Sequence, residues 1–235
     1  MQPWHIYDWP FGWGPPRPRT QLPRFRLNLF LQAKRPAYYK GKPRTLSTIH
    51  SLDAPLWAFR ITDHQQRLLE TLADKTRGRA HVAYASAAFH TNSALFTHTK
   101  CRTIVQNSTF PSVQALSGHE AWYYQGPGSQ GAANPDPESI EQPPLLERIR
   151  TLAREAEPQA PGNLAWLDTL AGNVIGAAGA VERADAVNVQ FFDDLQTLDR
   201  LAERYDLRPS LRAYAQVVLF TIRFDLNWLV VGSDV

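Results

Sequence analysis

Cysteine is nearly absent from this chain, since Cys101 is the single one among 235 residues. One thiol excludes a disulfide framework and also a zinc site built from several thiolates. No stretch approaches the roughly 18 consecutive apolar residues of a membrane span. The nearest candidate, Val217–Ile222, lies between Arg212 and Arg223. The first residues also lack the charged and apolar segments of a signal peptide. These absences predict a soluble cytoplasmic protein with no membrane partner.

Acidic residues are scarce at one end of the sequence. Residues 1–50 hold 9 Lys and Arg against a single acid, Asp8, whereas residues 136–235 hold 9 against 16 acids. The modest overall net charge of +3 therefore combines a basic front with an acidic back. A basic, arginine-rich front suits a polyanion such as DNA. It would equally suit docking onto the acidic half of the same chain or of a second copy, and the sequence leaves both interpretations open.

Several common catalytic motifs are missing as well. Gly126–Gly131 lacks the lysine and the preceding apolar strand of a phosphate-binding loop, and no G-x-S-x-G elbow occurs. His81, His90 and His98 are spaced by nine and eight residues, which matches no helical metal pair. We therefore interpret these histidines as solvated or hydrogen-bonded residues, and Cys101 as a small buried residue.

Aromatic residues are concentrated at the start of the chain, where five occur within thirteen positions and a proline-rich stretch, residues 14–23, follows them. They are Trp4, Tyr7, Trp9, Phe11 and Trp13. Rings of this number are expected in the core or in an interface, and stacking on nucleic-acid bases is the alternative.

Periodic patterns define the remaining elements. Strict alternation predicts a strand over residues 25–34, and a further extended segment follows at 55–61. A helix is expected to begin at a Thr62–Gln65 capping box and to end at Gly78. Further strands are predicted at 81–86, 103–106 and 121–125, and helices at 144–157, 163–181, 187–206 and 210–231. The expected organisation is an α/β core at residues 1–125, a loop or linker at 126–144 and a helical region at 145–235.

The string Gln32-Ala-Lys34, at the end of the first clear strand, carries the most chemical information. It places an amide oxygen and an ammonium group on one face of a strand. An amide oxygen can bind a hard divalent cation, and a lysine can position a water molecule or a phosphate. This string resembles the Gln-x-Lys variant of the PD-(D/E)XK nuclease superfamily, best known from Mrr-type restriction endonucleases. The order of an aspartate, the Gln-x-Lys strand, a helix and a further strand also agrees with that family.

The resemblance implies an α/β, restriction-endonuclease-like mixed sheet and a Mg²⁺-dependent DNA endonuclease, in a setting of restriction or anti-phage defence. Asp8 and Gln32 would hold the metal ion, and Lys34 would act on the attacking water. Asp53, Asp63 and Glu70 are alternative metal ligands. Gln65 and Gln66 could face the same site, although a capping role suits Gln65. The phosphate-binding residues would be Arg24, Arg26, Arg35, Lys40, Lys42 and Arg44.

A second hypothesis keeps the nuclease scaffold without catalysis. The family core normally opens with a helix before the aspartate, and no such helix precedes Asp8 in this sequence. Lys34 would then be an ordinary strand end and Asp8 a turn or capping residue. The chain would bind DNA, or would assemble through its charged halves as a homo-oligomer or with a partner protein.

Overall fold

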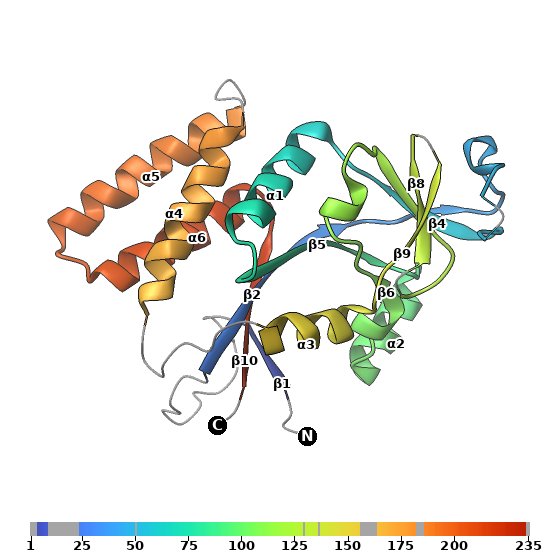
Figure 1. The fold of residues 1–235 in the computed structure, drawn as a ribbon, viewed down its shortest axis with the longest axis horizontal. Helices are drawn as coiled ribbons and strands as arrows, with labels where there is room; N and C mark the ends of the chain where they lie inside the picture. The colour runs from blue at the N-terminus through green and yellow to red at the C-terminus, as the bar shows by residue number, and fades with distance from the viewer. Residues whose placement is uncertain are drawn as a thin grey trace. The chain divides into compact units, whose positions relative to one another are not determined.

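The structure is a computed structural model that describes residues 4–8, 24–49, 51–128, 130–135, 137–155, 164–181 and 186–233. These residues form two β-sheets and six α-helices, which confirms the α/β class (Figure 1). The restriction-endonuclease-like arrangement stays a prediction. Within the same residues, no helix combines the length and apolarity needed to cross a membrane.

The chain forms two compact units, each built from segments distant in sequence. The first comprises Met1–Phe30, Arg67–Val82 and Ile149–Val235, and the second comprises Leu31–Gln66 and Ala83–Arg148. Two strands and two helices therefore contribute residues to both units. These elements are β2 (Arg24–Lys34), β5 (Ala80–Ala87), α1 (Asp63–Lys75) and α3 (Leu145–Glu155).

In the first unit, the strand β10 (Asn227–Ser233) pairs antiparallel with β1 (Trp4–Asp8), with Asp8 opposite Leu229. The strands of this sheet follow the order β1-β10-β2-β5-β6, in which β6 is Ser108–Thr109. The sheet thus joins the two ends of the described chain, a pairing that no local sequence pattern reveals.

Trp228 on β10 organises the apolar core of the first unit. Its ring stacks on Phe30 with centroids 6.3 Å apart, and Trp166 and Tyr214 pack against it at 6.4 and 5.9 Å. The indole Nε1 donates to the buried Asn28 Oδ1 at 2.9 Å, so these two buried polar side chains are paired with each other.

Three helices of the acidic half pack together in the first unit. α6 (Pro209–Arg223) contacts both α4 (Ala165–Ala180) and α5 (Ala186–Arg204), as Figure 1 shows in orange and red. Phe191 of α5 meets Phe220 of α6 edge-on, with centroids 5.9 Å apart. The other helix of this half, α3, is Leu145–Glu155.

The second unit contains an antiparallel sheet of order β3-β4-β7-β8-β9. Its strands are β3 (Ala37–Tyr39), β4 (Leu56–Arg60), β7 (Ala121–Tyr124), β8 (Gln130–Asn134) and β9 (Glu138–Glu141). Leu46, Ile49 and Leu52 form a buried cluster with Leu56 of β4, so the segment between β3 and β4 covers part of the sheet.

α2 (Asn92–Cys101) also belongs to the second unit, and the sequence patterns did not predict it. Thr91 caps it by accepting a hydrogen bond from the amide of Ala94 at 3.2 Å. None of its residues is buried. Cys101 is accordingly exposed, and its prediction as a buried residue is wrong.

Three further segments differ from the sequence predictions. Residues 126–144, expected as a loop, contain β8 and β9. The strand expected at 103–106 is a 3-10 turn, Val105–Asn107. The helix expected to reach residue 231 ends at Arg223, because Asp225 adopts a left-handed φ of 53° and Leu226 N donates to Thr221 O at 2.9 Å.

Part of the aromatic N-terminal cluster and the proline-rich stretch lie outside the described residues. For Trp4 and Tyr7, the structure describes the backbone of β1 alone.

Candidate functional site

The Gln-x-Lys string lies at the end of β2, as predicted. β2 is buried on both faces over Leu27–Phe30, and Gln32 is 2% exposed. Lys34, the last residue of the strand, is half-buried. Since Gln32 and Lys34 are two positions apart, their side chains share one face of the strand. A buried amide on that face needs a hydrogen-bonding partner, and the structure supplies it from a helix.

Gln65, in the first turn of α1, joins the two predicted site residues. Its Nε2 donates to Gln32 Oε1 at 2.7 Å, and its Oε1 accepts from Lys34 Nζ at 2.5 Å. The Gln65 side chain is therefore turned to the strand, and not back to the backbone of Thr62 as in the expected capping box. The interpretation in which Gln65 faces the Gln32–Lys34 site is confirmed.

An aromatic and amide layer lies beside this network. Lys34 Nζ is 5.4 Å from the centroid of the Tyr84 ring, a distance at which the ring face attracts a cation. The Tyr84 hydroxyl donates to Gln66 Oε1 at 2.7 Å, and Gln66 Nε2 donates to Val113 O at 2.8 Å. Tyr84 and Gln66 are both buried, so these hydrogen bonds are protected from solvent.

A hydroxyl pair supports the end of β2 from the other strands. Ser86 Oγ on β5 donates to the carbonyl of Lys34 at 2.9 Å. The Tyr124 hydroxyl on β7 lies 2.8 Å from Ser86 Oγ and 2.7 Å from the carbonyl of Ala87. Burial raises the pKa of Tyr124 well above its ordinary value, so this phenol keeps its proton and acts as a donor.

The sequence patterns did not single out Tyr84, and they indicated Gln65 and Gln66 only as residues that could face the site. For the two glutamines, a usable signal was the presence of polar side chains within an apolar helical stripe. Gln65 and Gln66 stand four and three positions before Leu69, which is fully buried. Polar residues at such spacing point to the covered face of the helix, where they require buried partners.

In the described part of the chain, the acidic residues predicted as metal ligands do not form a group. Asp8 ends β1, and β10 lies between β1 and β2 in the sheet order. The side chain of Asp8 lies outside the described part of the chain. Asp53 and Asp63 are exposed, and Glu70 is half-buried in the first unit. Among the described residues, no three His, Cys, Asp or Glu side chains form a group able to hold a metal ion.

The predicted phosphate-binding residues divide into three sets. Arg35, Lys40 and Arg44 are exposed in the second unit. Lys42 is half-buried, because its ammonium donates to the carbonyl of Ile49. Arg24 and Arg26 begin β2, with side chains outside the described part of the chain. The exposed set therefore offers three cations on the segment that leaves the Gln32–Lys34 strand end.

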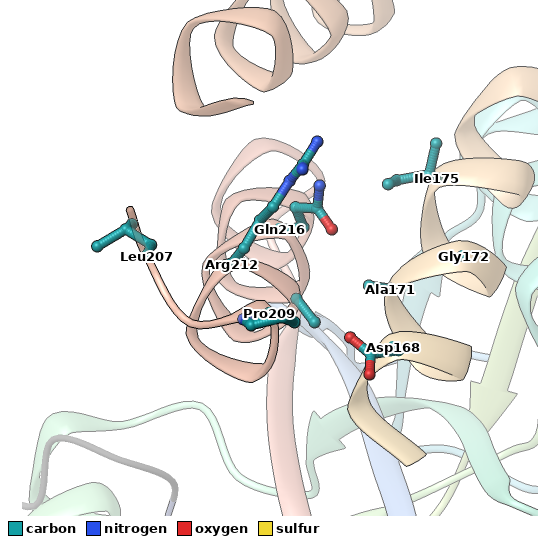
Figure 2. Close-up of a pocket in the computed structure, with 9 residues that line it drawn as sticks. Asp168, Ala171, Gly172, Ile175, Leu207, Pro209, Arg212 and Gln216 are labelled. Carbon is teal, nitrogen blue, oxygen red and sulfur yellow. The ribbon is translucent and has the colours of Figure 1, made fainter. Parts of the chain in front are cut away.

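A separate pocket of about 420 Å³ lies between α4 and α6 in the first unit. Figure 2 shows Asp168 on α4 opposite Arg212 and Gln216 on α6. Arg212 and Gln216 both donate to Asp199 of α5, at 2.9 and 3.0 Å. The Arg212 and Gln216 side chains therefore hold α5 against α6. The residues that line the pocket include none of those predicted for the nuclease site.

No family model, no curated protein and no solved structure matches this chain.

Proposed function

We propose that this protein binds nucleic acid through a basic surface of its second unit, on a nuclease-like scaffold. One observation carries the proposal. Arg35, Lys40 and Arg44 are exposed on the segment that directly follows the Gln32–Lys34 strand end. The sequence has no acid at all between Asp8 and Asp53, so no neighbouring carboxylate along this segment neutralises these cations. Exposed cations that follow one another along a segment can provide the electrostatic part of phosphate binding.

A magnesium ion does not fit the described residues as its ligands. Mg²⁺ is held by carboxylates and other oxygen atoms in a near-octahedral shell. The strand end supplies a single amide oxygen, Gln32 Oε1, which already accepts a hydrogen bond from Gln65. The adjacent group, Lys34 Nζ, is a cation and would repel the metal. The described geometry therefore supports binding more directly than metal-assisted hydrolysis.

The test compares two triple variants by fluorescence anisotropy on labelled duplex DNA over a range of salt concentrations. The first replaces Arg35, Lys40 and Arg44 by glutamine. The matched control replaces three exposed arginines of the first unit, Arg77, Arg150 and Arg154, and so removes the same charge.

Each lost phosphate contact on duplex DNA lowers the slope of log K against log salt by about 0.9. We therefore expect the first triple variant to reduce the magnitude of this slope by about 2–3 and to weaken binding. The control variant should leave the slope and the affinity nearly unchanged. Equal effects of the two variants would show that net charge alone attracts DNA and would remove the basis of the proposal.

Metal-dependent hydrolysis of DNA is the second candidate, because Gln32 and Lys34 converge on one helical side chain, Gln65. A time course on plasmid DNA with Mg²⁺ and with EDTA tests it. Lys34→Ala is the test variant. Lys75→Ala is the control, since Lys75 is an exposed lysine at the end of α1, outside the predicted nuclease site. Mg²⁺-dependent cleavage that Lys34→Ala loses and Lys75→Ala keeps would establish the enzyme. DNA binding without cleavage would support the binding function.

A further inference from the structure

A row of aromatic rings crosses the second sheet and ends at its exposed edge. Tyr38 of β3 pairs with Trp57 of β4, and Trp57 pairs with Tyr124 of β7. The ring centroids are 5.8 Å apart for Tyr38 and Trp57, and 6.2 Å apart for Trp57 and Tyr124. Burial falls along the row: Tyr124 is buried, Trp57 is half-buried and Tyr38 is 37% exposed. The Tyr38 ring at the edge of the sheet is therefore held in place by its contact with Trp57.

His90 extends this row toward solvent. Its imidazole stacks on the Tyr38 ring, with centroids 4.1 Å apart and an interplanar angle of 13°. His90 is itself exposed. Its neighbour Phe89 packs on His98 of α2 at 4.8 Å, which ties the loop carrying His90 to that helix. Exposed rings that are already oriented by their neighbours offer stacking area at little cost in side-chain entropy.

Exposed cations occur on the chain segments that carry the stacked pair. Arg35 precedes β3 and Lys40 follows it, and both are exposed. Lys100 and Arg102, at the end of α2, are exposed as well. The sequence has no acid between Asp74 and Glu120, so the segment carrying His90 and α2 is free of carboxylates. Charge complementarity therefore favours a polyanion as the occupant of this surface.

We propose that Tyr38 and His90 form a base-stacking site for single-stranded nucleic acid, flanked by Arg35 and Lys40 as phosphate contacts. This inference rests on the proposed function and specifies its substrate. Aromatic rings beside cations are the combination that binds single strands, because every base presents a π-face and every linker a phosphate. In a duplex the bases stack on each other, so their faces are not available to Tyr38 and His90.

The experiment measures anisotropy of labelled oligo-dT and of an abasic oligonucleotide of equal length, which has the same phosphates without bases. Tyr38→Leu is the test variant. Tyr39→Leu is the matched control, because Tyr39 has the same 37% exposure and lies on the opposite face of the same strand. Tyr38→Trp keeps an aromatic ring and shows whether loss of binding follows from loss of stacking or from misfolding.

We expect the unmodified protein to prefer oligo-dT, and Tyr38→Leu to weaken that binding by roughly 5- to 150-fold, the range for losing one stacked base. Binding of the abasic strand should not change. Tyr39→Leu and Tyr38→Trp should both retain the preference for oligo-dT.

Equal affinity for the two oligonucleotides, or equal losses in Tyr38→Leu and Tyr39→Leu, would overturn the stacking site. If these results came with salt-dependent duplex binding through Arg35, Lys40 and Arg44, the proposed function would still stand. Absence of binding to all three nucleic acids would refute both proposals.

Discussion

Replacing Tyr124 by phenylalanine would remove one oxygen atom from the support of the Gln32–Lys34 strand end. The Tyr124 hydroxyl has a single proton, which it shares between Ser86 Oγ at 2.8 Å and the carbonyl of Ala87 at 2.7 Å. Ser86 uses its own proton for the carbonyl of Lys34. Phenylalanine has the same ring, so the substitution leaves no large cavity. The change in stability then reports the lost hydrogen bonds and not a loss of packing.

The expected cost of Tyr124→Phe follows from the burial of these groups. Tyr124 is fully buried and Ser86 is 3% exposed, so water does not replace the lost donor. A buried hydrogen bond lost in this way lowers the free energy of unfolding by about 1–2 kcal/mol. For a chain of this length, that loss corresponds to a fall in the unfolding temperature of about 2–8 °C.

Thermal unfolding followed by circular dichroism would measure this fall. Tyr205→Phe is the control, because Tyr205 is 65% exposed and the same oxygen is removed into solvent. An unfolding temperature for Tyr124→Phe equal to that of the control would refute the argument that the Tyr124–Ser86 pair stabilises the end of β2.

Two further predictions concern pH and packing. Burial raises the pKa of Tyr214 to about 12 and also raises that of Tyr124, while the unfolded chain ionises tyrosine near 10. The contribution of the two neutral tyrosines to the free energy of unfolding is therefore fully present below pH 10 and is lost as the pH rises above it. In urea unfolding, the free energy of unfolding should fall less over this pH range for Tyr124→Phe than for the unmodified protein. Gly131→Ala would place a methyl carbon 2.5 and 2.6 Å from ring carbons of Trp122, which is buried. Urea unfolding should show a loss of about 1–3 kcal/mol or more, and an unchanged midpoint would disprove the clash.

The elements that the sequence predicted are those with a local repeat. The alternation over residues 25–34 became β2, and the stripe with Leu68, Leu69 and Leu72 became α1. The strand at 81–86 is part of β5. In each case neighbouring residues share one environment, so a period of two or of about 3.6 records which face is covered.

β10 shows where such patterns fail. The helix predicted over residues 210–231 includes residues 227–231, yet these residues lie in a strand between β1 and β2. Its partner β1 lies at the other end of the described chain. Residues 228–231 are all apolar, and a continuous apolar run suits either element over so short a span. The pairing with distant strands decides between the two.

The candidate sites divide in the same way. The sequence alone determined that Gln32 and Lys34 share a face, and that the surrounding segment is basic and free of acids, because both are properties of neighbouring residues. Tertiary structure decided that Gln65 binds both side chains and that His90 stacks on Tyr38. These contacts join residues 31 to 52 positions apart, and composition and spacing carry no record of which distant side chains meet.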